Sequence, residues 1–210
     1  MLREGSGLSR RSTELAAFGR ELKIVLRGRP GDERKLLFVG ILNKYLPEGG
    51  REAVLVGGAL VEFYTSGGYV TGDIDVIGDR DAIVPLLEAT GFAKSARTWW
   101  NTDLELVVDI AGRDLRRTEH VVRVEFAGYS IPTVSLEDLI VDRLLAATYW
   151  KSRTDWEQAM LLLRAHRNRV NSAALERKAG QNDVAEPLRN LISALETAGD
   201  GPSPSKKRPE

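Results

Sequence analysis

The segment from Val54 to Ile77 constrains the fold of this chain more than any other part of the sequence. It begins as an apolar run that ends in Gly57 and Gly58, continues with apolar residues at helical spacing, and closes on a short strand that carries Asp73 and Asp75. Glycine leaves room for a close approach to the backbone, and the start of a helix favours an anion. The order strand, two glycines, helix therefore predicts a turn that can bind phosphate.

Asp73 and Asp75 are separated by one residue on the predicted strand. Since successive side chains of a strand point to opposite faces, both carboxylates are expected on the same face, where paired carboxylates can hold a divalent metal ion. Taken alone, two glycines are more often an ordinary turn, and two aspartates more often a solvated strand edge. The order in which they occur is what favours a nucleotide site.

This order resembles the minimal nucleotidyltransferase signature of the DNA polymerase beta superfamily, in which a Gly-Gly or Gly-Ser turn precedes an Asp-x-Asp strand. The stretch VGGALVEFYTSGGYVTGDIDV is also similar to small prokaryotic nucleotidyltransferase-like proteins, some of whose relatives are toxins of toxin-antitoxin and abortive-infection systems. Two departures stand out. Ala59 follows the glycines, so no serine hydroxyl is offered to the phosphate there, and fourteen residues separate Gly58 from Asp73.

The resemblance implies an α/β (α+β) fold, with a nucleotidyltransferase-type mixed sheet backed by helices and a helical C-terminal region. It implies transfer of NMP from an NTP to an acceptor hydroxyl, with Mg²⁺ or Mn²⁺ as the cofactor. The acceptor stays open between RNA such as tRNA, a protein and a small molecule, and a small antitoxin-type partner is expected. The rival interpretation is a protein that keeps the fold without the chemistry and binds a nucleotide or a partner.

A third carboxylate is expected on the strand from Leu104 to Ile110, which reads LELVVDI. A period of two places Glu105, Val107 and Asp109 on one face. A carboxylate on a buried strand needs a partner or a metal, because an isolated buried charge is costly. Within the resemblance Asp109 takes the position of the third carboxylate, converging with the Asp-x-Asp pair, and Glu105 is the reserve candidate. Alternatively, Asp109 is a turn residue at the end of the strand.

Basic residues of the C-terminal region are the remaining candidates for the site. Asp142 and Arg143 interrupt an apolar helical run, while Lys151 and Arg153 lie at a junction between two predicted helices. Relatives of the suspected family carry a comparable Asp-Arg-Leu helix and a Trp-Lys-x-Arg junction. The resemblance implies that Arg143, Lys151 and Arg153 bind the nucleotide together with the Gly57–Gly58 backbone. A structural ion pair for Asp142 and Arg143, and a plain solvated junction for the other two, are the alternatives.

Composition and patterning divide the chain into four predicted parts: a mobile tail over 1–12, a nucleotidyltransferase-like core over 13–134, a helical region over 135–198 and a disordered tail over 199–210. The 30 basic and 30 acidic residues balance, so any contact with nucleic acid has to be local. No cysteine is present, which excludes a disulfide framework and a thiolate metal site. The chain shows neither a secretory signal pattern nor a long apolar run, so we expect a cytoplasmic protein.

Several local signals predict where elements begin. Asp32 is expected to cap the second N-terminal helix, which follows a first helix starting at Thr13. Ser135 and Asp138 form a predicted capping pair, and Thr154 with Glu157 offers a second capping box. Strands are predicted over 121–126 and 129–134, and a helix over 79–90. His120 and His166 lack neighbouring ligand patterns, so neither is expected to bind a metal or to act in catalysis.

Overall fold

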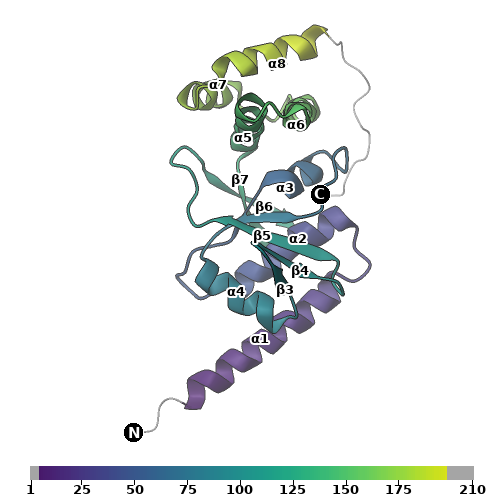
Figure 1. Ribbon diagram of the computed structural model, residues 1–210, viewed down its shortest axis with the longest axis vertical. Coiled ribbons are helices and arrows are strands. Elements are labelled where there is room, and N and C mark those ends of the chain that lie inside the picture. Colours follow the sequence, from purple (N-terminus) through teal and green to yellow (C-terminus); the bar gives the residue numbers. More distant parts are fainter. Residues whose placement is uncertain (1–4, 198–210) are drawn as a thin grey trace. The chain divides into compact units, whose positions relative to one another are not determined.

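The computed structural model describes residues 5–197, which form eight helices and one seven-stranded sheet (Figure 1). The helices are α1 (Gly5–Val25), α2 (Gly31–Tyr45), α3 (Gly57–Tyr64), α4 (Arg80–Ala89), α5 (Leu136–Tyr149), α6 (Arg153–Ala165), α7 (Ser172–Gln181) and α8 (Ala185–Thr197). The strands are β1 (Val54–Val56), β2 (Ile74–Ile77), β3 (Ala93–Ser95), β4 (Thr98–Asn101), β5 (Leu106–Gly112), β6 (Val121–Phe126) and β7 (Tyr129–Val134). The expected mixed α/β class is confirmed.

The sheet has the strand order β3-β4-β5-β2-β1-β7-β6. β2 pairs in parallel with β5, and β1 in parallel with β7, whereas β1–β2, β3–β4 and β4–β5 are antiparallel. β6 and β7 have the predicted bounds and are joined by Ala127 and Gly128, which both have positive φ (49° and 84°), as a two-residue hairpin turn requires. The sheet is therefore mixed, with β2 and β5 side by side near its centre.

Helices α1, α2 and α4 pack together on one face of this sheet (Figure 1). Their inward positions carry fully buried apolar side chains such as Phe18, Leu37 and Leu87, which follow helical spacing. α1 begins at Gly5, so the predicted mobile tail is helical from that residue on, and its first four residues lie outside the described part of the chain. The predicted disordered tail over 199–210 lies outside it as well.

Two of the predicted helix caps are wrong and one is confirmed. Pro30 occupies the N-cap position of α2 and no side chain caps it; Asp32 lies in the first turn, where a carboxylate favours the helix dipole. Ser135 caps α5, since its hydroxyl accepts from the Asp138 backbone N–H at 3.1 Å and donates to the Asp138 carboxylate at 2.6 Å. α6 is capped by Ser152 and not by Thr154, because the chain turns into the helix two residues earlier than predicted.

The chain divides into two compact units. The first unit contains the sheet with α1, α2 and α4, and takes residues up to 60, 71–115 and 121–133. The second takes residues 61–70, 116–120 and those from 134 on, and is mainly helical. Residues 61–70 and 116–120 fall within the predicted core over 13–134, and this division groups them with the C-terminal helices.

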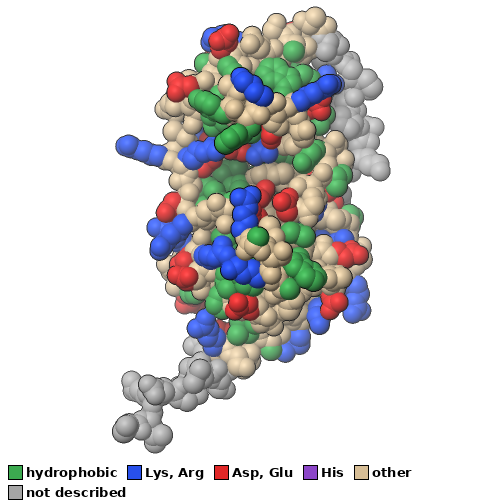
Figure 2. Space-filling model, in the orientation of Figure 1, with side chains coloured by type: hydrophobic (Ala, Val, Ile, Leu, Met, Phe, Trp, Pro, Cys, Tyr) green, Lys and Arg blue, Asp and Glu red, His purple; other side chains and the backbone are tan. Residues whose placement is uncertain are grey.

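The surface carries both signs of charge. On the face drawn in Figure 2, basic and acidic side chains are interspersed, in keeping with the balanced composition of the sequence. Within residues 5–197 no helix has the length and apolar character needed to cross a bilayer.

Candidate functional site

Gly57 marks the point where β1 runs directly into α3. Its φ is +67°, a left-handed conformation that costs an L side chain energy. A Cβ placed on it would overlap Oδ2 of Asp75 and lie 2.9 Å from the Asp75 Cγ. The two residues meet because β1 and β2 are antiparallel with Val56 paired to Asp75. Glycine is therefore required here twice, once by the backbone conformation and once by the aspartate beside it.

Gly58 lies against the segment that holds Asp73. A Cβ on Gly58 would lie 3.0 Å from Oγ1 of Thr71, and that hydroxyl donates to Oδ1 of Asp73 at 2.7 Å. The Thr71 carbonyl accepts from Nζ of Lys35 on α2 at 2.5 Å. Lys35 is buried, and sequence reasoning missed it. The only sequence signal for Lys35 is its place within an apolar helical run. A lysine there is expected to be buried, and a buried ammonium group needs oxygen partners.

Asp75 and Asp109 lie next to each other on neighbouring strands. β2 and β5 are parallel, and their register pairs Asp75 directly with Asp109. Paired residues of parallel strands point to the same face and are spaced by about 4.8 Å. Asp73 precedes β2, which begins at Ile74, so the strand pairing does not include it. The observed pairing places Asp75 and Asp109 on one face, and a common face with Asp73 stays a prediction.

Asp109 is a strand residue and only 5% exposed, which excludes the alternative that it is a turn residue at a strand end. Its Oδ2 accepts from Nε of Arg97 at 3.1 Å. Its Oδ1 is buried and has no hydrogen-bond partner. Arg97 comes from the turn between β3 and β4, and its side chain is otherwise largely exposed. Sequence reasoning did not identify this arginine, since nothing local ties it to β5.

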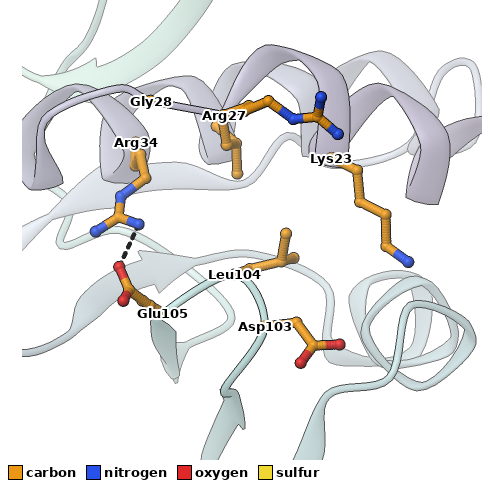
Figure 3. A pocket seen from close by; sticks show the side chains of 8 residues that line it. Lys23, Arg27, Gly28, Arg34, Asp103, Leu104 and Glu105 are labelled. Atoms are coloured by element: carbon orange, nitrogen blue, oxygen red, sulfur yellow. Dashed lines mark hydrogen bonds and ion pairs between the residues drawn. The ribbon is translucent and has the colours of Figure 1, made fainter.

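Glu105, the reserve third carboxylate, lies in the turn before β5 with a φ of +53°. Its carboxylate is mostly exposed and accepts from Nη1 of Arg34 at 2.5 Å (Figure 3). This pair lies at a cavity of about 430 Å³, which is lined by Lys23, Leu26, Arg27, Gly28, Arg34, Asp103, Leu104 and Glu105. Glu105 thus lies outside β5 and is engaged by Arg34, so it does not share the strand position that Asp109 has.

Convergence of three carboxylates on one metal ion is not observed. Among residues 5–197, no three Asp, Glu, His or Cys side chains form a group that could hold a metal. Asp109 is engaged by Arg97 and Asp73 by Thr71, so these two carboxylates have protein partners in the observed arrangement. The assignment of Asp73, Asp75 and Asp109 as metal ligands stays a prediction.

The basic residues predicted to bind the nucleotide lie in the second unit. Arg143 is held within it by Asp142 at 2.5 Å, Asp155 at 2.9 Å and Gln158 at 3.3 Å, so the structural ion pair is present. Arg153 pairs with Glu157 one turn along α6, and Lys151 is exposed at the junction between α5 and α6. A role of the three cations in nucleotide binding stays a prediction.

Both histidines lie in the second unit and contact polar groups of that unit. Nε2 of His166 lies 2.7 Å from the Tyr64 carbonyl, and burial lowers the pKa of this imidazole below its usual value of 6.5. His120 lies beside a buried ion pair, in which Nζ of Lys178 donates to Oδ1 of Asp138 at 2.5 Å and lies 2.9 Å from Nδ1 of His120. Both arrangements fix helices of the second unit.

Comparison with known proteins gives one distant likeness. A solved structure described as an antigenic nucleotidyltransferase-like protein from Paracoccidioides brasiliensis superposes with a TM-score of 0.47 and 15% sequence identity, covering 76% of this chain and 92% of that one. No protein-family model and no curated protein matches the chain. A likeness at this level carries no argument about function, which has to come from the geometry of β1, α3, β2 and β5.

Proposed function

We propose that this protein is a metal-dependent nucleotidyltransferase, in which an acceptor hydroxyl loses its proton and attacks the α-phosphate of an NTP, so that the α–β phosphoanhydride bond breaks, NMP is joined to the acceptor and pyrophosphate leaves. The observation that carries the proposal is the side-by-side pairing of Asp75 and Asp109 on β2 and β5. Asp75 also lies against Gly57, the first residue of α3. A Gly-Gly turn that starts a helix, next to paired carboxylates on central strands, suits a ligand that carries both phosphate and metal.

The donor set at Asp109 suits a divalent cation. A buried carboxylate oxygen without a partner costs about 1–3 kcal/mol, and an ion is one of the physical reasons why such an atom persists. Oδ1 of Asp109 is such an atom, and Asp75 is its strand neighbour. We assign Asp73, Asp75 and Asp109 to hold Mg²⁺ or Mn²⁺. Arg97, whose side chain is largely exposed, would leave Asp109 when the cation binds, because the cation then supplies the positive charge that the buried carboxylate needs.

The residues of the chain have separate tasks in this proposal. The backbone N–H groups that begin α3 at Gly57 and Gly58 bind and orient the phosphates. Lys35 and Thr71 hold the segment that presents Asp73. When bound, the metal supplies charge neutralisation and a lowered pKa of the acceptor hydroxyl.

Two observations favour the rival function, a nucleotide-binding or partner-binding module without chemistry. The ion pair between Arg97 and Asp109 neutralises the most buried of the three aspartates, and within the described residues no group of three metal ligands is formed. A protein that had lost catalysis would keep such an ion pair permanently. A toxin-antitoxin role and a small partner remain predictions of the resemblance.

The test is transfer of label from α-labelled NTPs to total RNA and to total protein, with Mg²⁺ or Mn²⁺ and all four bases. We expect labelling by the wild type, and a loss on the order of a hundredfold or more in Asp75→Asn and in Asp109→Asn. The matched control is Asp81→Asn, an exposed carboxylate in the first turn of α4.

Calorimetry of NTP binding in Mg²⁺ and in EDTA separates the two functions. The enzyme requires metal-dependent affinity that Asp75→Asn removes. No labelling of either acceptor class, together with equal NTP affinity in Mg²⁺ and EDTA, would establish the binding module instead.

A further inference from the structure

The junction between α5 and α6 exposes two aromatic rings that follow each other in the sequence. Trp150 is 83% exposed, more than any other large hydrophobic side chain among the described residues, and Tyr149 is 62% exposed. Tryptophan is usually well buried even where it is not fully enclosed, because exposing its large apolar ring to water is unfavourable. Two neighbouring exposed rings therefore indicate a surface that has a ligand.

The junction is fixed by hydrogen bonds on both sides. The Trp150 N–H donates to the Ala146 carbonyl at 3.0 Å and so closes the last turn of α5. Ser152 caps α6, and Asp155 in its first turn pairs with Arg143 of α5 at 2.9 Å. The rings are therefore presented by backbone that is already ordered, so a ligand would not have to pay for ordering it.

Lys151 separates the exposed rings from α6 and adopts a left-handed φ of +54°. Glycine is the usual residue for such a position after a helix, since a lysine there costs about 1 kcal/mol or more. This conformational strain at a lysine indicates that the lysine side chain has a function at this position. Lys151 is exposed, and none of the ion pairs found among residues 5–197 involves it.

Arg153 adds a second cation at the start of α6. Its Nε pairs with the Glu157 carboxylate at 2.9 Å, and both side chains are largely exposed. An exposed i,i+4 pair of this kind contributes only about 0.3–0.5 kcal/mol, so a ligand anion can take the place of the glutamate. The sequence Tyr-Trp-Lys-Ser-Arg thus presents two rings and two cations on one short, ordered segment.

We propose that this segment, residues 149–153, binds single-stranded nucleic acid, with unpaired bases stacked on Trp150 and Tyr149 and phosphates held by Lys151 and Arg153. A single strand carries unpaired bases, which stack on exposed aromatic side chains, and phosphates, which bind to cationic side chains nearby. A protein occupant would favour rings embedded in further apolar surface, and here the chain places charges directly beside them. The balanced overall charge of the chain makes such a local site necessary for any contact with nucleic acid.

The test is fluorescence anisotropy of a labelled, uridine-rich single-stranded RNA at low salt, without NTP or metal. We expect Trp150→Ala to weaken binding by about fivefold or more, as loss of one base–aromatic stack does. Trp150→Phe should retain most of the affinity, and Trp150→Leu should not, because leucine keeps apolar area without a stacking face. The matched control is Trp100→Ala, which removes another exposed tryptophan, from β4.

Two further measurements make the outcome decisive. Lys151→Ala should lower the dependence of log Kd on log salt by about 0.7, the effect of one phosphate contact on a single strand. A duplex of the same sequence should compete poorly, because its bases are already stacked. Equal binding of wild type and Trp150→Ala, or equal binding of duplex and single strand, would overturn the proposal.

This inference is independent of the proposed reaction. Asp75→Asn should bind the single strand as the wild type does, although it is expected to lose transfer. A wild-type protein that labels an acceptor but does not bind the single strand would refute the surface alone, and a wild-type protein that binds the single strand but labels nothing would refute the enzyme alone.

Discussion

Replacement of Gly57 by alanine tests whether the turn exists to make room for Asp75. The new Cβ would lie 2.9 Å from Cγ and 3.0 Å from Cβ of Asp75, so the carboxylate has to leave its position. The matched control is Gly28→Ala. Gly28 has a φ of +70°, nearly that of Gly57, and nothing lies within 4 Å of the position of its Cβ. The two substitutions thus share the backbone cost and differ in the contact with Asp75.

The expected difference can be worked out from these contacts. A left-handed alanine costs about 1–2 kcal/mol, of which about 0.4–1 kcal/mol is regained because alanine restricts the unfolded chain. Gly28→Ala should therefore lower the free energy of unfolding by about 1 kcal/mol. Forcing Asp75 away from its rotamer adds about 0.5–1.5 kcal/mol, so Gly57→Ala should lower the free energy of unfolding by about 1.5–2.5 kcal/mol.

Urea unfolding followed by far-UV circular dichroism measures both values, and calorimetry with Mn²⁺ measures the consequence for Asp75. We expect Gly57→Ala to weaken Mn²⁺ binding and Gly28→Ala to leave it unchanged. Equal losses of stability in the two variants, combined with unchanged Mn²⁺ affinity in Gly57→Ala, would refute the reasoning that this glycine serves the aspartate.

Two predictions concern the second unit. Lys178→Met leaves the buried Asp138 carboxylate without its cation and should lower the free energy of unfolding by about 3 kcal/mol, as measured by urea unfolding. In the double variant with Asp138→Asn, the loss of stability should be well below the sum of the two single losses. Burial lowers the pKa of His166, whose stabilising neutral form is fully present above pH 6.5, so stability should fall as the pH drops from 6.5 through the lowered pKa. Melting temperatures measured over this range should show a flatter profile for His166→Gln, and an equally steep profile in that variant would assign the effect to another group.

The sequence by itself determined the elements whose signals are local. The bounds of β6 and β7 follow from alternation on either side of a turn, and α4 follows from apolar residues at helical spacing after Asp79, which caps it. Ser135 was identified as a cap because its partner is three residues away. The turn at Gly57 was also readable, since a glycine pair between an apolar run and a helix has few other uses. At the start of α6 the predicted capping box at Thr154 and Glu157 placed the cap two residues too late, because Ser152 is the residue that caps the helix.

Only the tertiary structure decided which groups meet. The pairing of Asp75 with Asp109 depends on β5 lying next to β2, a neighbour that the period of two cannot choose. Lys35 contacts Thr71, and Arg97 contacts Asp109. The partners in each contact are distant in the sequence, so no local pattern predicts these contacts. The sequence specifies a face for each carboxylate, because side-chain direction is a property of one strand. Whether a carboxylate on that face meets an arginine, a threonine or another carboxylate is a property of the packed fold.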